Sequence, residues 1–188
     1  MEDRLNKPQL KEEKAIILDY LEHGYHFDTS PVKSSIAQAL GLGHLTILEL
    51  IPKKGVFLQP SEEVYIGEGK RDKIHHIKGR IAAEKLTATA QSQLKHVIEE
   101  IVSKDQKRFI EFFNKAQPLS TRMHQLELLP GLGKKHMTEI LEARREKPFE
   151  DFTDLKNRVK LIPDPKMVVV KRIISELEGK EKYKIFIS

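Results

Sequence analysis

Cysteine is absent from the 188-residue sequence. This absence excludes a disulfide framework and any metal site built on thiolates. The sequence also lacks any apolar stretch near the ~20 residues that a membrane-spanning helix needs. Its first residues, Met-Glu-Asp-Arg, lack the apolar run typical of a signal peptide. From these absences we expect a soluble, cytoplasmic protein with no membrane role.

The formal net charge is +5, and the excess of positive charge is not spread evenly. Residues 118–188 hold fifteen Lys and Arg against eleven Asp and Glu, whereas residues 1–117 hold eighteen against seventeen. The imbalance in the C-terminal part agrees with a polyanionic partner. With 32% charged residues, a solvated and salt-bridged surface also explains much of it without any ligand.

The length suits two domains, and the hydrophobic pattern predicts an α+β chain. In the first 86 residues, short apolar runs separated by turn residues predict five strands, with one short helix over 35–40. Five short strands suggest a small closed or half-closed β-barrel of the oligonucleotide/oligosaccharide-binding (OB) type. The expected strands cover residues 15–21, 45–51, 56–58, 64–67 and 77–83.

A helical linker is expected over residues 87–117. Thr87 is a suitable N-cap for its first helix, and Ser103-x-x-Gln106 has the pattern of a capping box that starts a second. The aromatic residues near Phe109 and Phe113 fall at helical spacing, which is more typical of a core than of a base-stacking surface. The linker therefore leads into a separate C-terminal helical domain over 118–188.

The clearest motif is Leu-Pro-Gly-Leu-Gly-Lys-Lys at 129–135, between two runs of helical periodicity. Glycine reaches positive φ and leaves backbone amides uncovered, and the dipole of the following helix adds partial positive charge there. Such a corner, followed by two lysines, favours a phosphate ligand. The alternative is a simple turn between two core helices with solvated lysines.

Residues 121–155 resemble a helix-hairpin-helix motif, the sequence-tolerant module of many DNA- and RNA-binding proteins. The resemblance implies that amides near the two glycines hold a phosphate, and that the carbonyls of Glu127, Leu129 and Leu132 share a monovalent cation. The nucleic-acid-binding residues predicted from this segment are Pro130, Gly131, Leu132, Gly133, Lys134 and Lys135.

A second hairpin is expected to follow, with Thr153 capping its first helix and residues 167–177 forming its last. Its turn, Leu-Ile-Pro-Asp-Pro at 161–165, has no glycine. Proline has no N–H to offer and aspartate repels phosphate, so we expect one phosphate site and not two. Alternating residues over 183–187 predict a final strand that returns to the barrel sheet.

A second nucleic-acid contact is predicted in the loop over 67–80, which has five basic residues and only two acids. On a barrel such a loop would present a basic edge to a phosphate backbone, and nearby Tyr65 could stack on a base. An ordinary solvated loop is an equally good interpretation. The basic residues concerned are Lys70, Arg71, Lys73, Lys78 and Arg80.

The whole arrangement resembles an archaeal family of uncharacterised proteins described as RNA-binding or nucleic-acid-binding. Three segments carry the resemblance: residues 64–74, 109–119 and 126–135. It implies a small β domain followed by a helix-hairpin-helix, and a setting near ribosome assembly or transcription. It supplies no catalytic residues.

An enzyme is the competing class, and the sequence offers little for it. Metal-dependent nucleases need clustered acids, whereas the Asp and Glu residues here are scattered. A glycosylase needs a catalytic Asp or Lys beyond the turn, and residues 146–165 show no such pattern. Neither His75 with His76 nor His23 with His26 has an evident third metal ligand. We therefore expect no catalysis, no metal and no cofactor.

The sequence thus predicts a non-catalytic nucleic-acid-binding protein, with RNA preferred over DNA only through the family resemblance. Ribosomal or transcription components are the expected surroundings. A protein-interaction adaptor stays open as an alternative, because hairpin helices can also bury their faces against a protein. Salt dependence separates the two, since counterion release makes nucleic-acid binding steeply salt-sensitive.

Overall fold

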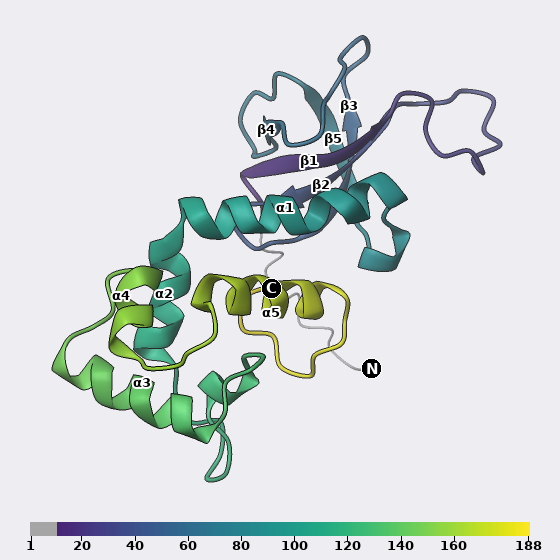
Figure 1. The fold of residues 1–188 in the computed structure, drawn as a ribbon. Helices are drawn as coiled ribbons and strands as arrows, with labels where there is room; N and C mark the ends of the chain where they lie inside the picture. The colour runs from purple at the N-terminus through teal and green to yellow at the C-terminus, as the bar shows by residue number, and fades with distance from the viewer. Residues whose placement is uncertain (1–10) are drawn as a thin grey trace, which may run out of the picture. The chain divides into compact units, whose positions relative to one another are not determined.

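A computed structural model describes residues 11–188 and divides them into two compact units (Figure 1). The first contains the described residues up to Val97 together with Lys184–Ser188, and the second contains Ile98–Tyr183. The first unit is built on a five-stranded antiparallel sheet, and the second is helical. The predicted α+β class is therefore confirmed.

The sheet has the order β4-β1-β2-β3-β5. Its first four strands follow a Greek-key order, since β4 returns by a long connection to lie beside β1. The described strands form an open sheet with β4 and β5 at its two edges, so the barrel is not closed by strand pairing. The strands are β1 (Lys14–Leu21), β2 (Ile36–Gly41), β3 (Ile47–Pro52), β4 (Glu63–Tyr65) and β5 (Ile74–Arg80).

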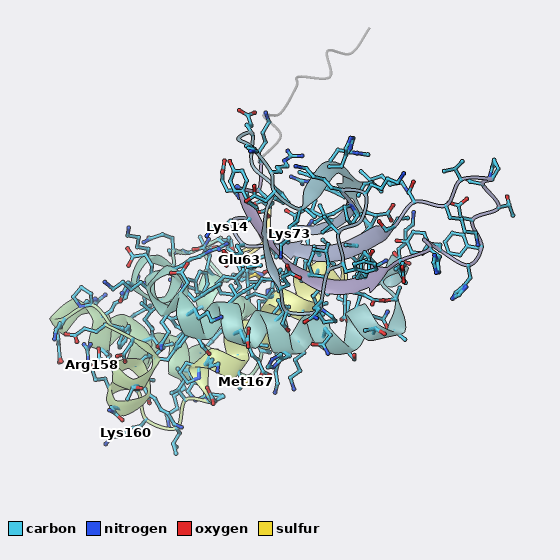
Figure 2. All side chains as sticks on the ribbon, turned by 90° about the horizontal axis from the view of Figure 1, so that it is seen from above. Lys14, Glu63, Lys73, Arg158, Lys160 and Met167 are labelled. Atoms are coloured by element: carbon cyan, nitrogen blue, oxygen red, sulfur yellow. The ribbon has the colours of Figure 1, made fainter. Side chains whose placement is uncertain are left out.

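Contacts on both sides of β1 fix its place in the sheet. Ala15 pairs with Gly41 of β2 on one side and with Val64 of β4 on the other. At the β4 edge, the Lys14 ammonium and the Glu63 carboxylate form an ion pair at 2.8 Å (Figure 2). The apolar side chains of the sheet form one cluster, which includes Ala15, Ile17, Ala37, Ala39, Leu48, Leu50, Leu58, Val64, Ile66 and Ile74.

The helix predicted over 35–40 is wrong, because these residues form strand β2. The segment Ile-Ala-Gln-Ala-Leu-Gly is rich in alanine, which favours helices in isolation. Here all six residues are buried, and the strand pairs with both β1 and β3. Pairing at the centre of the sheet therefore outweighs local helix propensity.

Two other predicted strands are absent from the described residues. Residues 56–58 form a loop, although Leu58 still packs into the sheet core. Residues 183–187 also form no strand, although the next residue, Ser188, donates its amide to the His44 carbonyl at 3.4 Å. The strand predicted over 77–83 begins earlier, at Ile74, and ends at Arg80.

Helix α1 crosses from the first unit into the second. Within residues 11–188, no helix combines the length and apolar character that crossing a bilayer requires. The helices are η1 (Ala83–Lys85), α1 (Ala88–Lys104), α2 (Gln106–Lys115), η2 (Gln125–Leu128), α3 (Lys134–Glu146), α4 (Phe152–Arg158) and α5 (Pro165–Leu177).

The predicted helix caps hold in one case of three. The Thr87 hydroxyl accepts the Ala90 amide at 3.1 Å, as expected for the start of α1. The Ser103 hydroxyl instead donates to the Glu99 carbonyl, so no capping box starts α2. Helix α4 is capped by Asp151 and not by Thr153, because the Asp151 carboxylate accepts the Asp154 amide.

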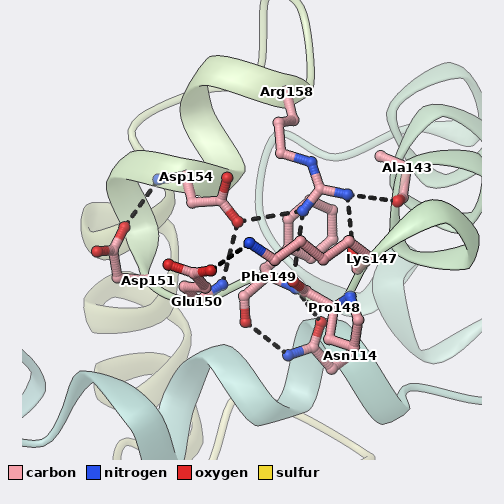
Figure 3. A network of polar contacts seen from close by, with 9 residues as sticks. All are labelled: Asn114, Ala143, Lys147, Pro148, Phe149, Glu150, Asp151, Asp154 and Arg158. Carbon is pink, nitrogen blue, oxygen red and sulfur yellow. Dashed lines mark hydrogen bonds and ion pairs between the residues drawn. The ribbon is translucent and has the colours of Figure 1, made fainter.

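The connector between α3 and α4 is fixed by Arg158 (Figure 3). Its guanidinium donates to the carbonyls of Ala143 at 2.5 Å and Lys147 at 2.7 Å, and it lies over the Phe149 ring. The same group pairs with the Asp154 carboxylate at 3.1 Å. Arg158 therefore holds the C-terminal end of α3 and is committed to the fold.

Candidate functional site

The candidate site is the turn between η2 and α3, in the second unit. The first hairpin helix is shorter than predicted, a single 3-10 turn of four residues that begins after His124. The His124 Nδ1 atom accepts the Leu126 amide at 3.1 Å, while the Glu127 carboxylate accepts the His124 amide at 2.8 Å. This reciprocal cap starts the segment.

Burial lowers the pKa of the His124 imidazole, and the nearby Arg144 guanidinium lowers it further. The neutral ring is the form that can accept a hydrogen bond at Nδ1. Leu126 within the short helix and Leu129 directly after it are almost fully buried. The entry to the turn is therefore fixed by a cap and by core packing together.

The two glycines of the turn have different conformations. Gly131 has φ +81°, in the left-handed region that favours glycine. Gly133 has φ −104° and ψ −173°, an extended conformation open to any residue, and it is the N-cap of α3. Of the two glycines, only Gly131 therefore has a backbone conformation that favours glycine. A Cβ atom added at Gly133 would meet no other group within 4 Å.

Helix α3 begins with its backbone amides open. Its N-cap makes no side-chain hydrogen bond, so the amides of the first turn have neither an intrahelical acceptor nor a cap. Lys134 and Lys135 follow at once; both are exposed, and neither forms an ion pair with any residue in the described part of the chain. The helix dipole and two free ammonium groups thus add positive charge at one point.

The other predicted residues of the turn have separate roles. Leu132 is 6% exposed and packs inward, so its side chain belongs to the core. Its amide bonds to the Leu129 carbonyl at 3.2 Å, which occupies one of the oxygens considered for a cation. Pro130 is exposed beside the glycines. The surface open to a ligand is therefore formed by Gly131, Gly133 and the two lysines.

A buried arginine that sequence reasoning missed supports this turn. Arg172 of α5 is 3% exposed and donates to the Leu128 carbonyl at 2.8 Å, at the end of η2. Glu176 at 2.8 Å and Glu181 at 2.7 Å balance its charge. An arginine in an apolar helical pattern gives no sequence signal of this kind, because its partners come from two other segments.

The start of α5 differs from the start of α3. The Asp164 carboxylate accepts the amides of Lys166 at 3.0 Å and Met167 at 3.3 Å, and Pro165 contributes no N–H. These amides are already satisfied within the protein. The loop before α5 lies against the glycine turn, since the His136 ring bonds to the Leu161 carbonyl at 3.1 Å.

At least three of the five basic residues predicted in the loop of the first unit form ion pairs or hydrogen bonds within the protein. Lys73 pairs with Glu62, Lys78 pairs with Glu49 at 2.5 Å, and the Arg71 side chain donates to the Gly67 carbonyl at 2.8 Å. Lys70 is exposed and makes no ion pair within residues 11–188, and Arg80 is exposed on β5. The five predicted cations therefore do not form one free basic surface.

Tyr65, the predicted stacking residue, is held by the same loop. Its hydroxyl accepts the Gly69 amide at 3.1 Å, and its ring lies so close to Gly67 that a Cβ there would sit 2.4 Å from the phenolic oxygen. Only 36% of the residue is exposed. The ring fixes the loop and presents little open face.

Sequence reasoning missed the most exposed aromatic pair, which lies in the loop between β1 and β2. The rings of Tyr25 and Phe27 stack with centroids 4.9 Å apart and an interplanar angle of 9°. Phe27 is 81% exposed. The spacing Tyr-x-Phe beside a turn cluster was the available signal, but a loop pattern does not show which rings will stack.

Metal-binding groups do not assemble in the described chain. Within residues 11–188, no three His, Asp or Glu side chains are grouped in a way that could hold an ion. His75 and His76 approach each other, with their Nδ1 atoms 2.7 Å apart, and no third ligand joins them.

Comparison with known proteins places this architecture in a family. The family model described as "Protein of unknown function (DUF655)" matches residues 11–188. The chain belongs to the DUF655 family. An uncharacterized protein of Methanocaldococcus jannaschii is 44% identical over 184 residues, which cover 97% of this chain and 82% of that protein. The expected archaeal relatives are therefore found.

A solved structure of the DUF655 family has the same fold. The crystal structure of a family member from Archaeoglobus fulgidus matches with a TM-score of 0.85 and 42% sequence identity. The match covers 94% of this chain and the whole of that chain. Both the sheet and the helical region thus belong to an arrangement shared within the family.

Proposed function

We propose that this protein binds nucleic acid without catalysing a reaction on it, and that it grips the phosphate backbone at the start of α3. In this proposal, η2, the glycine turn and α3 form a helix-hairpin-helix. RNA is the preferred ligand, following the resemblance to archaeal RNA-binding proteins. Ribosomal or transcription complexes in the cytoplasm are the proposed setting.

The carrying observation is that Gly133 is not required by the fold. Its backbone is extended, and the space where a Cβ would lie is empty. A residue such as Asp or Ser would cap α3 and stabilise it more than glycine does. Glycine at this N-cap leaves the amides open and allows another backbone to approach closely, as a phosphate-binding turn requires.

The surroundings support the same proposal. The two lysines next to the open amides supply charge without being neutralised by carboxylates of the described chain. The five strands in partial Greek-key order fit an OB-like barrel, a type that commonly binds oligonucleotides. The OB-like assignment is therefore part of the proposal.

The test is binding of the full chain to labelled RNA and DNA, followed by fluorescence anisotropy, for the parent and for Gly133→Val. The branched side chain adds no charge, and its Cβ atom would meet no other group within 4 Å, so the fold should tolerate it. We expect affinity to fall at least about tenfold, because the turn can no longer approach the phosphate closely.

Thermal unfolding provides the control for this variant. If Gly133→Val unfolds at the parent temperature and binds both nucleic acids as tightly as the parent, the phosphate site is not at this turn. Binding that barely responds to salt would instead favour an apolar protein interface, since nucleic-acid binding loses affinity steeply as salt rises.

A further inference from the structure

A cavity of about 940 Å³ in the first unit lies beside the exposed aromatic pair. Tyr25 and Phe27 contribute aromatic rings to its wall, and the end of β5 contributes the basic residues Lys78 and Arg80. Neither the glycine turn nor the expected role of Tyr65 accounts for this site. Its ligand can be inferred from the geometry of the wall and from the charges around it.

A buried network of hydrogen bonds holds the Tyr25 side chain in place. The Tyr25 hydroxyl donates to the Glu49 carboxylate at 2.6 Å and accepts from the Gln38 amide at 2.9 Å. Gln38 is fully buried and also bonds to the Lys85 carbonyl and the Thr87 amide. Tyr25 is therefore held in one orientation, although its loop is long.

Phe27 lies on this fixed ring and turns its other face outward. The two rings are almost parallel, so the outer face is flat and continuous with a supported platform. Removing the apolar surface of a phenyl ring from water is favourable, and stacking on one neighbour covers only one of the two ring faces. The uncovered face suits another flat ring.

The charges in the cavity wall are balanced. Three cations face three anions: Lys78, Arg80 and Lys85 against Asp28, Glu49 and Glu84. A balanced wall does not favour a buried phosphate, and it suits an uncharged ring. Lys78 and Arg80 are both exposed and both line the cavity, with Lys78 paired to Glu49, so the two cations can border the charged backbone of the same ligand.

We propose that the Tyr25–Phe27 platform stacks on an unpaired base of single-stranded nucleic acid. Every base has a flat π face, and in a duplex both faces are already covered by neighbouring bases. The inference deepens the proposed function by naming the strandedness of the ligand, and it rests on that function only in taking nucleic acid as the partner.

The test uses the absence of tryptophan from the sequence. Phe27→Trp in the full chain places a single indole on the platform, where stacking on a base quenches its fluorescence. We expect quenching by an oligouridine of about 12 nucleotides, a length that spans a typical single-strand site. A duplex of the same length and an equal nucleotide concentration of uridine monophosphate should quench far less.

Phe57→Trp is the matched control. Phe57 is also exposed in the first unit, at 66%, but it packs edge-to-face on Tyr20 and does not line the cavity. Its emission should not respond to the oligouridine. An equal response at position 57, or equal quenching by the monophosphate, would overturn the assignment of the site to a base in a strand.

Affinity gives the second measurement. Phe27→Ala should weaken single-strand binding roughly 5- to 100-fold, the range for one lost base–aromatic stack, and leave duplex binding unchanged. If labelled oligouridine binds with full affinity to Phe27→Ala, and the emission of Phe27→Trp stays constant, the platform inference is wrong while the glycine-turn proposal stands. The same conclusion follows if Gly133→Val loses binding while Phe27→Ala does not.

Discussion

The second unit contains two helix–loop–helix segments, η2 to α3 and α4 to α5. The chain reverses similarly in both loops, but with different residues. In each loop a residue with positive φ precedes a buried apolar residue. Gly131 at +81° precedes Leu132, and Leu161 at +58° precedes Ile162. The chain reversal is therefore similar, although only the first turn uses glycine for it.

The two segments differ most at the N-cap of the second helix. Asp164 closes the start of α5 with its own carboxylate, whereas Gly133 leaves the start of α3 open. Since α5 shows that a capped version of this turn folds, the open amides of α3 are not a requirement of the architecture. The difference agrees with the proposal that the first segment binds a ligand, whereas the second helix start is closed by its own cap.

The strongest test of the comparison between the two segments is Gly133→Asp, which gives α3 an aspartate N-cap like that of α5. Asp151 shows that an aspartate in an extended conformation at an N-cap accepts an amide of the first helical turn. The new carboxylate should therefore cap α3 and raise the free energy of unfolding by about 0.5 kcal/mol. It should also repel phosphate and lower nucleic-acid affinity about 100-fold.

For one Gly133→Asp sample, calorimetry should thus show a higher stability than the parent, whereas anisotropy should show a lower affinity for nucleic acid. A variant that is both more stable and unimpaired in binding would show that α3 does not hold the phosphate. Asp164→Gly is the reverse change, and it should lose a few tenths of a kcal/mol without gaining affinity, because Pro165 still offers no amide.

The next effect is that of the lysines. Replacing Lys134 and Lys135 with alanine should reduce the slope of log affinity against log salt by roughly one to two units, with a loss of about tenfold near physiological salt. Lys166→Ala at the second position of α5 is the matched control, and its slope should equal that of the parent. Equal slopes for all these variants would assign the charge contact elsewhere.

The positive-φ residues give a smaller effect, on stability alone. Gly131→Ala should cost about 1–2 kcal/mol, because an alanine is strained at +81° and its Cβ would lie 3.4 Å from Pro163. Leu161→Asn should gain about 0.5 kcal/mol, since asparagine tolerates this region and Leu161 is 85% exposed. Urea unfolding of both variants measures the difference.

The sequence predicted much of this unit because local signals determine it. The spacing of apolar residues located α3 and α5, and the missing glycines at 161–165 predicted a turn without open amides. The α4 cap was predicted at Thr153, but the helix already begins at Phe152 and its N-cap is Asp151. Choosing between such caps depends on where the helix starts, which is the least certain feature of a pattern.

The first unit was harder to predict because its elements depend on distant partners. Strand β2 carries helix-favouring alanines and becomes a strand through its two neighbours. Similarly, the basic residues near Lys73 and Lys78 appeared free in the sequence, whereas Glu62 and Glu49 pair with them across the fold. The aromatic platform likewise requires Glu49 and Gln38, which lie far from Tyr25 along the chain.

The last effect depends on pH and concerns the first caps of the two segments, His124 and Asp151. Burial lowers the pKa of His124 below its value in the unfolded chain. As the pH falls, the unfolded state therefore binds a proton at a higher pH than the folded state does. The contribution of His124 to the free energy of unfolding is complete above about pH 6.5 and declines as the pH falls below that value. Protonation also removes the acceptor at Nδ1 that holds the Leu126 amide.

Lowering the pH from 7.5 to 5.5 should weaken the η2 turn by no more than a lost cap, about 1 kcal/mol. Hydrogen exchange resolves this locally, because the Leu126 amide should lose protection while the Asp154 amide, bonded to a carboxylate, serves as the internal standard. His124→Asn keeps a capping acceptor without titrating in this range and should abolish the pH dependence at Leu126. If its protection still falls with pH as in the parent, another group controls the turn, and the two segments do not differ through this cap.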